Sequence, residues 1–165
     1  MIKTKRLTLK SMTESDAEAA LDLLTNDIIK QTYMLPDFEQ RSDALPLFHR
    51  IMTLSQDPAR FVKGIYLNDY LIGSMNEVER IGDAVEIGYL LHPDHHNQGY
   101  MTEALAAAFP HLFRMGFREV ICGAFEHNKA SLRVMEKAGM KRIEKVDEID
   151  YRGKTHRCIY FHITK

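Results

Sequence analysis

The feature that most constrains the fold is a strand, a polar loop with a glycine, and a helix that follow one another directly. The largely apolar run 84–91 predicts a strand, and apolar residues at helical spacing predict a helix over 102–115. In the loop between them, Gly99 lets the main chain approach a bound group closely. The first N–H groups of a helix lack intrahelical partners and carry partial positive charge, so this junction can bind an anion such as phosphate. A glycine in such a loop more often serves the turn alone, so the motif needs support from elsewhere in the chain.

A second junction of the same kind follows further along the chain. A strand predicted over 119–126 leads into a helix with Asn128 as its N-cap and Gly139 at the position typical of a C-cap. The order strand, helix, strand, helix predicts a parallel crossover in which both loops open at the same edge of the sheet. We therefore expect two polar loops to face one ligand.

With these motifs the sequence resembles the GNAT superfamily of acetyl-CoA-dependent N-acetyltransferases, and most of all its RimJ and RimL type ribosomal-protein branch. The segments that carry the resemblance are 4–10, 86–89, the loop through Gly99, 102–105 and 128–140. The family's phosphate-loop pattern, (Gln or Arg)-x-x-Gly-x-(Gly or Ala), falls on residues 96–101, and His96 and Met101 depart from it. Main-chain N–H groups hold the pyrophosphate in this family, so a protonated His96 can add a donor. The long side chain of Met101 must point away from the ligand.

The resemblance implies an α/β fold of the GNAT type in a single domain over residues 1–165. We expect a mixed central sheet of about six to seven strands, flanked by about four helices and splayed between its fourth and fifth strands, 84–91 and 119–126. The implied order is β-α-α-β-β-β-α-β-α-β-β. The further elements that the sequence predicts are an opening strand 4–10, helices 17–24 and 43–54, a hairpin of 61–67 and 70–78, a strand starting near residue 141, and a hairpin of 148–154 and 156–164. Pro110 predicts a kink or an early end in the helix after the glycine loop.

The chemistry that the resemblance implies is direct transfer of acetyl from the thioester to an amine, with no covalent enzyme intermediate. Glu86 is the candidate base, acting directly or through a water, and its alternative role is an ion pair with a Lys or Arg of a neighbouring strand. Main-chain N–H groups near Tyr89, Leu90 and Leu91 are the candidates to stabilise the oxyanion.

The resemblance also assigns the acetyl-CoA site residue by residue. The expected cofactor-binding positions are Leu90, Leu91, Asn97, Gln98, Gly99, Tyr100, Met101, Thr102, Asn128 and Ser131. Asn128 would hydrogen-bond the pantetheine, and Ser131 would donate to the leaving thiolate, because Val134 and Met135 stand where many relatives carry a tyrosine acid. The alternative is that Asn128 only caps its helix and that Ser131 is an ordinary polar residue of the first turn.

Two further groups of residues allow both a binding and a structural interpretation. Tyr33, Met34, Phe38 and Phe48 could line an acceptor pocket, although apolar stripes on such helices more often form core. Asp147, Glu148 and Asp150 could attract a cationic acceptor or form a solvated edge.

Composition narrows the class of function. The formal net charge is −1, and the chain has no dense run of Lys and Arg, which argues against a nucleic-acid-binding surface. No long apolar run is present, so we expect neither a membrane protein nor a secreted one, but a cytoplasmic one. Cys122 and Cys158 lie in apolar segments without metal-ligand spacing, as is typical of buried reduced thiols. His92, His95 and His96 lack a spaced supporting carboxylate, so no metal is expected.

The sequence therefore predicts an N-acetyltransferase that uses acetyl-CoA and a primary amine, either a peptide N-terminus or a small molecule. The alternative is a module of the same fold that binds or senses acyl-CoA without turnover. The acceptor and the oligomeric state are left open, and a homodimer is one of the alternatives.

Overall fold

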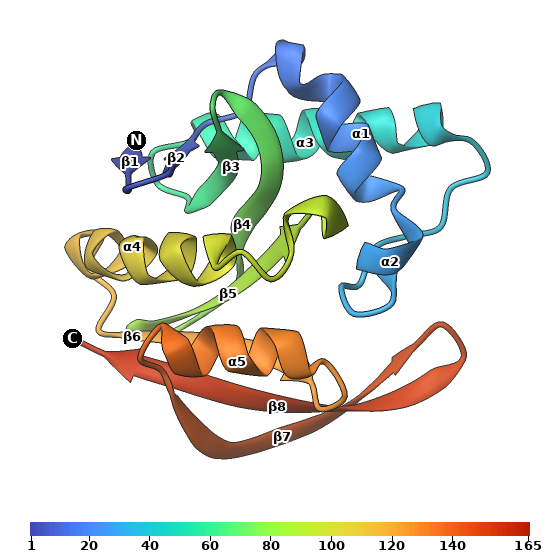
Figure 1. Ribbon diagram of the computed structural model, residues 1–165. Helices are drawn as coiled ribbons and strands as arrows, with labels where there is room; N and C mark the ends of the chain where they lie inside the picture. Colours follow the sequence, from blue (N-terminus) through green and yellow to red (C-terminus); the bar gives the residue numbers. More distant parts are fainter. The chain divides into compact units, whose positions relative to one another are not determined.

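The computed structural model describes all residues, Met1–Lys165, and contains eight strands and five helices (Figure 1). In chain order they are β1 Ile2–Lys3, β2 Leu7–Lys10, α1 Ala17–Leu24, α2 Asp27–Lys30, α3 Leu45–Gln56, β3 Val62–Leu67, β4 Tyr70–Ile81, β5 Ala84–Leu91, α4 Tyr100–Arg114, β6 Glu119–Phe125, α5 Lys129–Lys137, β7 Lys141–Tyr151 and β8 Lys154–Thr164. Short 3-10 turns lie at Glu14–Asp16, Arg41–Ala44 and Pro93–His95. The strands are hydrogen-bonded in the order β1-β2-β3-β4-β5-β6-β8-β7. The mixed α/β fold expected from the sequence is confirmed.

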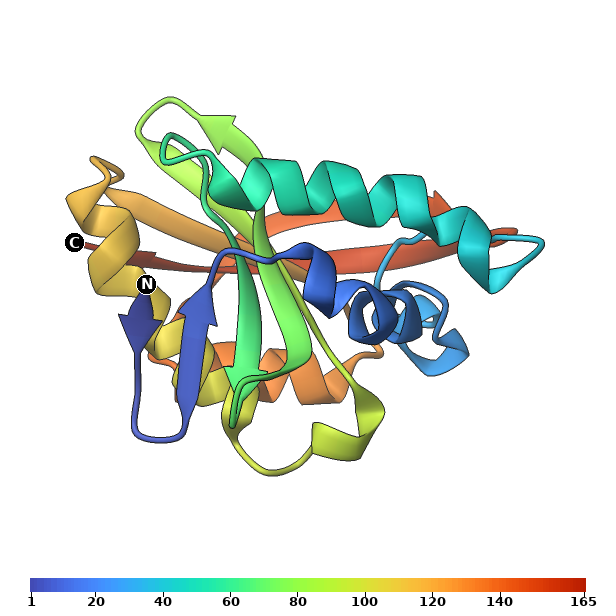
Figure 2. The ribbon, with the colours of Figure 1, turned by 90° about the horizontal axis from the view of Figure 1, so that it is seen from above.

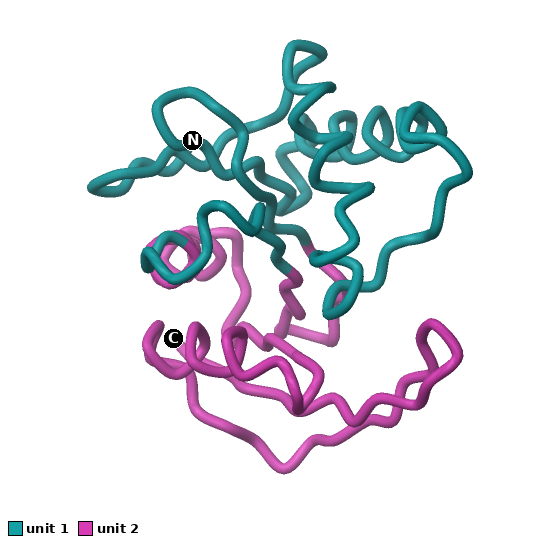
Figure 3. The backbone as a smooth tube through the Cα atoms, turned by 45° about the vertical axis from the view of Figure 1, so that its right-hand side comes forward, with its two compact units in different colours: residues 1–76, 89–100 teal, residues 77–88, 101–165 magenta.

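The chain divides into two compact units (Figure 3). Unit 1 consists of Met1–Asn76 and Tyr89–Tyr100, and unit 2 consists of Glu77–Gly88 and Met101–Lys165. Strands β4 and β5 therefore each contribute one part to each unit. The expectation of a single domain over 1–165 stays a prediction.

Unit 1 is an antiparallel sheet packed against helices. Strands β2, β3 and β4 lie side by side (Figure 2), and β3 turns into β4 through Asn68 and Asp69, whose φ angles of 49° and 63° suit a tight hairpin. Helix α1 has the bounds that its periodicity predicts, and a capping box between Thr13 and Asp16 precedes it. Its apolar face packs with α3 and the sheet in one core that includes Phe48.

Unit 2 contains the parallel pairing on which the predicted crossover depends. Residues Ala84–Glu86 of β5 pair with Glu119–Ile121 of β6, and the pairing stops there although β6 continues to Phe125. This short ladder is what a splayed sheet requires. Strand β8 lies between β6 and β7 and is antiparallel to both, and in Figure 1 helix α5 lies along these strands.

Several element boundaries differ from the predicted ones. The two-residue β1 and the one-turn α2 are additional, and they raise the counts to eight strands and five helices. The strand expected near residue 141 and the first arm of the last hairpin are one strand, β7, with an irregular register between Arg142 and Val146. Helix α4 continues past Pro110 to Arg114, so it does not end early at the proline, and the alternative of a kink stays a prediction. Loss of one N–H costs a hydrogen bond, but buried side chains such as Phe109 and Leu112 on both sides of the proline keep the helix packed.

Candidate active site

The glycine loop between β5 and α4 has the backbone of an anion-binding turn. Asn97 and Gly99 both have left-handed φ angles, 59° and 78°, and helix α4 begins at the next residue, Tyr100. Asn97, Gln98 and Gly99 are exposed. Alternating left-handed residues turn successive N–H groups toward one side, which is the geometry by which main chain binds phosphate.

Side chains of unit 1 hold this loop in shape. The ring Nε2 of His96 lies 2.9 Å from the carbonyl oxygen of Leu91, so this residue ties the loop to the end of β5. The Gln98 side chain donates to the carbonyl of Asp94 at 3.1 Å. Each of these bonds shapes the loop from within, and neither uses its main-chain N–H groups.

The two positions after Tyr100 belong to unit 2. Met101 is 6% exposed, so its long side chain packs in the protein interior. Thr102 is half-buried in the first turn of α4. The departure from a small residue at Met101 therefore puts no bulk on the exposed surface of the loop.

The end of β5 lies close to β4 because Gly73 of β4 has no side chain, a position that the sequence motifs did not single out. Leu90 and Leu91 are 6% and 8% exposed, so these positions offer main-chain groups rather than polar side chains. A Cβ at Gly73 in β4 would lie 2.4 Å from the carbonyl oxygen of Leu90, so no other residue fits there. A lone glycine inside an apolar strand pattern is the signal that marks such a close approach.

Glu86 lies in the part of β5 that belongs to unit 2, and 14% of its side chain is exposed. Burial is the main cause that raises the pKa of Glu86 above its ordinary value, and the Lys145 ammonium opposes this. The charges of Glu79 and Asp147 raise that pKa further. A half-buried carboxyl with a raised pKa is the form expected of a general base that works near neutral pH.

The ion pair considered as the alternative role of Glu86 is present but loose. The Nζ of Lys145 lies 3.9 Å from Oε2 of Glu86, too far for a hydrogen bond, and 3.7 Å from Oδ2 of Asp147. Lys145 is not on a neighbouring strand: it comes from β7, and the sheet order puts β6 and β8 between β7 and β5. With 37% of its side chain exposed, Lys145 contributes little net stability through this pair.

Tyr160 on β8 contacts Lys145 through the face of its ring. Its ring packs on Gly123 of β6, where a Cβ would lie 2.6 Å from the ring, and the Nζ of Lys145 lies 4.1 Å from the ring centroid. Burial, then hydrogen bonds to Asp147 and Cys158, raise the pKa of Tyr160 well above its ordinary value. Tyr160 therefore stays protonated and holds its neighbours in place.

Both cysteines are free and buried, as predicted. Burial raises the pKa of the Cys122 and Cys158 thiols. Neither is a thiolate near neutral pH, so neither has the reactivity of a nucleophile.

Asn128 caps helix α5 as the sequence predicts. Its Oδ1 accepts from the N–H of Ser131 at 3.2 Å, and both residues are half-buried. This bond uses the oxygen of the Asn128 amide and not its nitrogen, so capping and a contact with a cofactor are compatible. Their cofactor roles, and the expectation that both polar loops face one ligand, involve residues of both units and stay predictions.

The apolar residues considered as an acceptor pocket belong mainly to the core. Phe48 is 1% exposed, and Tyr33 and Phe38 pack against the same core, whereas Met34 is 53% exposed. The Tyr33 hydroxyl donates to Oδ1 of Asn76 at 2.8 Å, and burial raises its pKa to about 12. These contacts favour the structural interpretation of the group.

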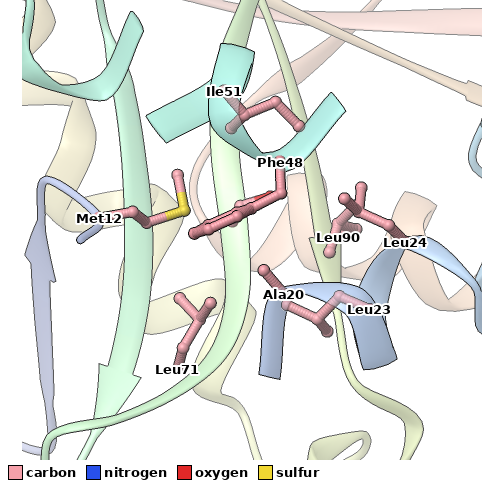
Figure 4. Close-up of a pocket in the computed structure, with 9 residues that line it drawn as sticks. Met12, Ala20, Leu23, Leu24, Phe48, Ile51, Leu71 and Leu90 are labelled. Atoms are coloured by element: carbon pink, nitrogen blue, oxygen red, sulfur yellow. The ribbon is translucent and has the colours of Figure 1, made fainter. Parts of the chain in front are cut away.

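A small apolar cavity of about 20 Å³ lies in unit 1 and is lined by Met12, Phe48 and Leu90 among others (Figure 4). A cavity of this volume has room for about one water molecule and not for an amine substrate.

No group of three or more His, Cys, Asp and Glu side chains is arranged to hold a metal ion. No helix has the length and hydropathy needed to cross a lipid bilayer.

Residues 6–141 match the acetyltransferase (GNAT) domain family. The chain belongs to this family of acetyltransferases. A relative, the uncharacterized N-acetyltransferase YoaA of Bacillus subtilis (strain 168), is 27% identical over an alignment of 147 residues that covers 86% of this chain and 83% of YoaA.

Solved GNAT structures agree with the fold. A GNAT-family acetyltransferase from Bacillus anthracis has a TM-score of 0.85 and 24% identity, over 99% of this chain and 97% of that one. RimL, a ribosomal L7/L12 alpha-N-protein acetyltransferase in complex with coenzyme A, has a TM-score of 0.84 and 22% identity, over 98% of this chain and 95% of that one. The resemblance to GNAT enzymes with RimL-like relatives is therefore confirmed.

Three residues around the GNAT site elements escaped sequence analysis. Gly73 carried a readable signal, as described above. The proximity of Lys145 to Glu86 could not be predicted from the sequence, because its strand, β7, is not adjacent to β5 in the sheet. Arg6 contacts Gln98 across 92 residues of sequence, and no local pattern reports such a contact.

Proposed function

We propose that this GNAT acetyltransferase moves acetyl directly from acetyl-CoA to a primary amine. The observation that carries the proposal is the exposed turn of Asn97 and Gly99, both left-handed, at the start of α4. Support for the cosubstrate comes from the RimL structure, whose description names coenzyme A. The pyrophosphate binds to main-chain N–H groups over residues 97–102, and Asn128 contacts the pantetheine.

The reaction forms a C–N bond to the amine, breaks the C–S bond of the thioester and moves one proton from the amine. The neutral amine attacks the thioester carbonyl carbon, and N–H groups near Leu90 and Leu91 stabilise the oxyanion. Collapse of the tetrahedral intermediate breaks the C–S bond and gives the amide and the thiolate. The proton lost by the amine goes to Glu86, directly or through a water, and the thiolate takes a proton or a hydrogen bond from Ser131.

The surroundings of Glu86 support its role as base. Burial outweighs the attraction of Lys145 and raises the pKa of Glu86, so the carboxylate accepts a proton more readily than an exposed one. The long distance of 3.9 Å to Lys145 leaves the carboxylate oxygens able to accept from an amine or a water.

The acceptor class follows from how much deprotonation the base must provide. An α-amino group has a reference pKa near 8 and a lysine amine one near 10.4, so at pH 7 roughly 250 times more of the α-amino group is neutral. A single half-buried carboxylate is better suited to deprotonating an α-amino group than a lysine amine. We therefore favour a peptide N-terminus, or a small amine of similar pKa, as the acceptor. RimL, described as an alpha-N-protein acetyltransferase, supports this class.

Mass spectrometry identifies the acceptor. The protein is incubated with isotopically labelled acetyl-CoA and a cell extract that contains peptides and metabolites. Label on peptide N-termini or small amines is expected. Labelling confined to hydroxyl or thiol groups would contradict the proposed acceptor class.

A further inference from the structure

One side chain of the N-terminal segment, Arg6, contacts the residues on both sides of Gly99 in the glycine loop. The Nη1 of Arg6 donates to the carbonyl oxygen of Gln98 at 2.9 Å, and the guanidinium carbon lies 4.4 Å from the centroid of the Tyr100 ring. Its Nη2 lies 3.5 Å from the position of a Cβ built on Gly99. All these residues belong to unit 1, and Arg6 directly precedes β2.

The bond to Gln98 fixes the direction of a neighbouring donor. In a trans peptide the C=O of one residue and the N–H of the next point to opposite sides of the chain. The chain has no cis peptide bond. Because Arg6 holds the carbonyl of Gln98 on its own side, the N–H of Gly99 points away from Arg6.

The contact of Arg6 with Tyr100 restrains the residue that follows Gly99. A guanidinium over an aromatic ring is attracted by the ring face, and its planar shape restrains the ring more than a lysine would. Tyr100 is the first residue of α4, so Arg6 bridges the left-handed turn to the start of the helix. Gly99 has a φ of 78°, and a flexible residue of this kind is otherwise free to rotate its peptide groups.

We propose that Arg6 is a positioning residue for the phosphate loop: it orients the Gly99 N–H toward the pyrophosphate of acetyl-CoA and restrains Tyr100, the first residue of α4. Arg6 does not touch the ligand in this account. The inference rests on the proposed function, since it assigns the residue that preorganises the same loop. Its charge is exposed and screened, so orientation contributes more than attraction.

The test compares Arg6→Met with Lys5→Met by calorimetry with coenzyme A. Both changes remove one exposed positive charge in adjacent positions, whereas the hydrogen bond to Gln98 and the ring contact with Tyr100 come from Arg6. We expect Arg6→Met to weaken binding about tenfold, the usual scale for loss of a charged hydrogen bond, and Lys5→Met to change it less than about twofold. Arg6→Lys keeps the charge without the planar group and should lose about threefold. Equal affinities of Arg6→Met and the unchanged protein, or equal losses in Arg6→Met and Lys5→Met, would overturn the inference.

Dephospho-CoA, which retains the pyrophosphate but lacks the 3′-phosphate, distinguishes positioning of the pyrophosphate loop from direct contact with the 3′-phosphate. If Arg6 orients the pyrophosphate loop, Arg6→Met weakens coenzyme A and dephospho-CoA by the same factor. A loss confined to coenzyme A would instead make Arg6 a ligand of the 3′-phosphate and refute the positioning role.

Hydrogen exchange of the free protein separates this inference from the proposed function. Peptides covering residues 92–102 should exchange faster in Arg6→Met than in Lys5→Met, while the remaining peptides and the melting temperature stay unchanged. Unchanged exchange in these peptides would contradict the role of Arg6 even if coenzyme A binds. Failure of the unchanged protein to bind coenzyme A, with faster exchange in Arg6→Met, would contradict the proposed function and leave the positioning of the loop supported.

Discussion

Asn128 makes a capping bond with one end of its amide, so two substitutions at this position separate its structural role from its proposed contact with the cofactor. Oδ1 accepts from the N–H of Ser131 at 3.2 Å. Asn128→Ala removes both the cap and the side-chain N–H₂ donor. Asn128→Asp keeps an oxygen for the cap and removes only the donor.

The expected change in stability follows from loss of the single capping bond. Loss of an N-cap costs about 1 kcal/mol, and for a chain of this length that lowers the melting temperature by about 2–4 °C in Asn128→Ala. Asn128→Asp should melt within about 1 °C of the unchanged protein, because a carboxylate caps a helix N-terminus at least as well. Both variants should bind coenzyme A about tenfold more weakly, since each lacks the donor to the pantetheine amide.

Calorimetry with coenzyme A and thermal melts on the same samples measure both effects. Ala130→Asp is the matched control, because it adds the same charge at an exposed neighbouring position of the first turn of α5. If Asn128→Asp binds coenzyme A as tightly as Ala130→Asp does, Asn128 is a cap alone and its place in the cofactor site is refuted.

Three further substitutions test the other roles. Gly99→Val should weaken coenzyme A binding more than tenfold in calorimetry, about 1.4 kcal/mol or more, because a β-branched residue is strained at a φ of 78°; unchanged affinity in a folded protein would exclude the pyrophosphate loop. Glu86→Gln should lower turnover most for amines of high pKa and remove the fall in rate as the pH drops through the raised pKa of Glu86. Equal kinetic losses for all amines would indicate a structural role. Because folding raises the pKa of Glu86, ionisation of this carboxyl lowers the stability of the folded protein as the pH rises. Above that pKa, Glu86→Gln should therefore be at least as stable as the unchanged protein in denaturant unfolding. Ser131→Ala should lower kcat and kcat/KM together by roughly ten- to a hundredfold, with only a few tenths of a kcal/mol lost in stability; an unchanged kcat would leave solvent as the proton source.

Local sequence patterns predicted the elements that local physics determines. The left-handed turn at Asn68 and Asp69, the cap at Asn128 and the positive φ of Gly139 each depend on the preferences of one or two residues. Helix α1 was predicted to the residue, because its apolar spacing and its capping box agree.

Local sequence patterns could not predict contacts between segments that lie far apart in the chain. Lys145 reaches Glu86 from a strand that is not adjacent to β5 in the sheet, and it lies within the irregular register of β7 between Arg142 and Val146. Arg6 reaches Gln98 from the opening hairpin. The helix predicted over 102–115 is present, and it does not end early at Pro110, because the packing of Phe109 and Leu112 outweighs the local penalty of the proline.

The central claim is direct acetyl transfer, and the stoichiometry of turnover with purified protein tests it most directly. Released coenzyme A and acetylated amine are measured together over a panel of amines that spans α-amino and lysine-like pKa values. We expect repeated turnovers with one coenzyme A released for each acetylated amine, and no acetylated form of the protein. Binding of acetyl-CoA without amine-dependent release would indicate a sensing module, and an acetylated protein that passes its label to the amine would show a covalent intermediate; either result would contradict the account.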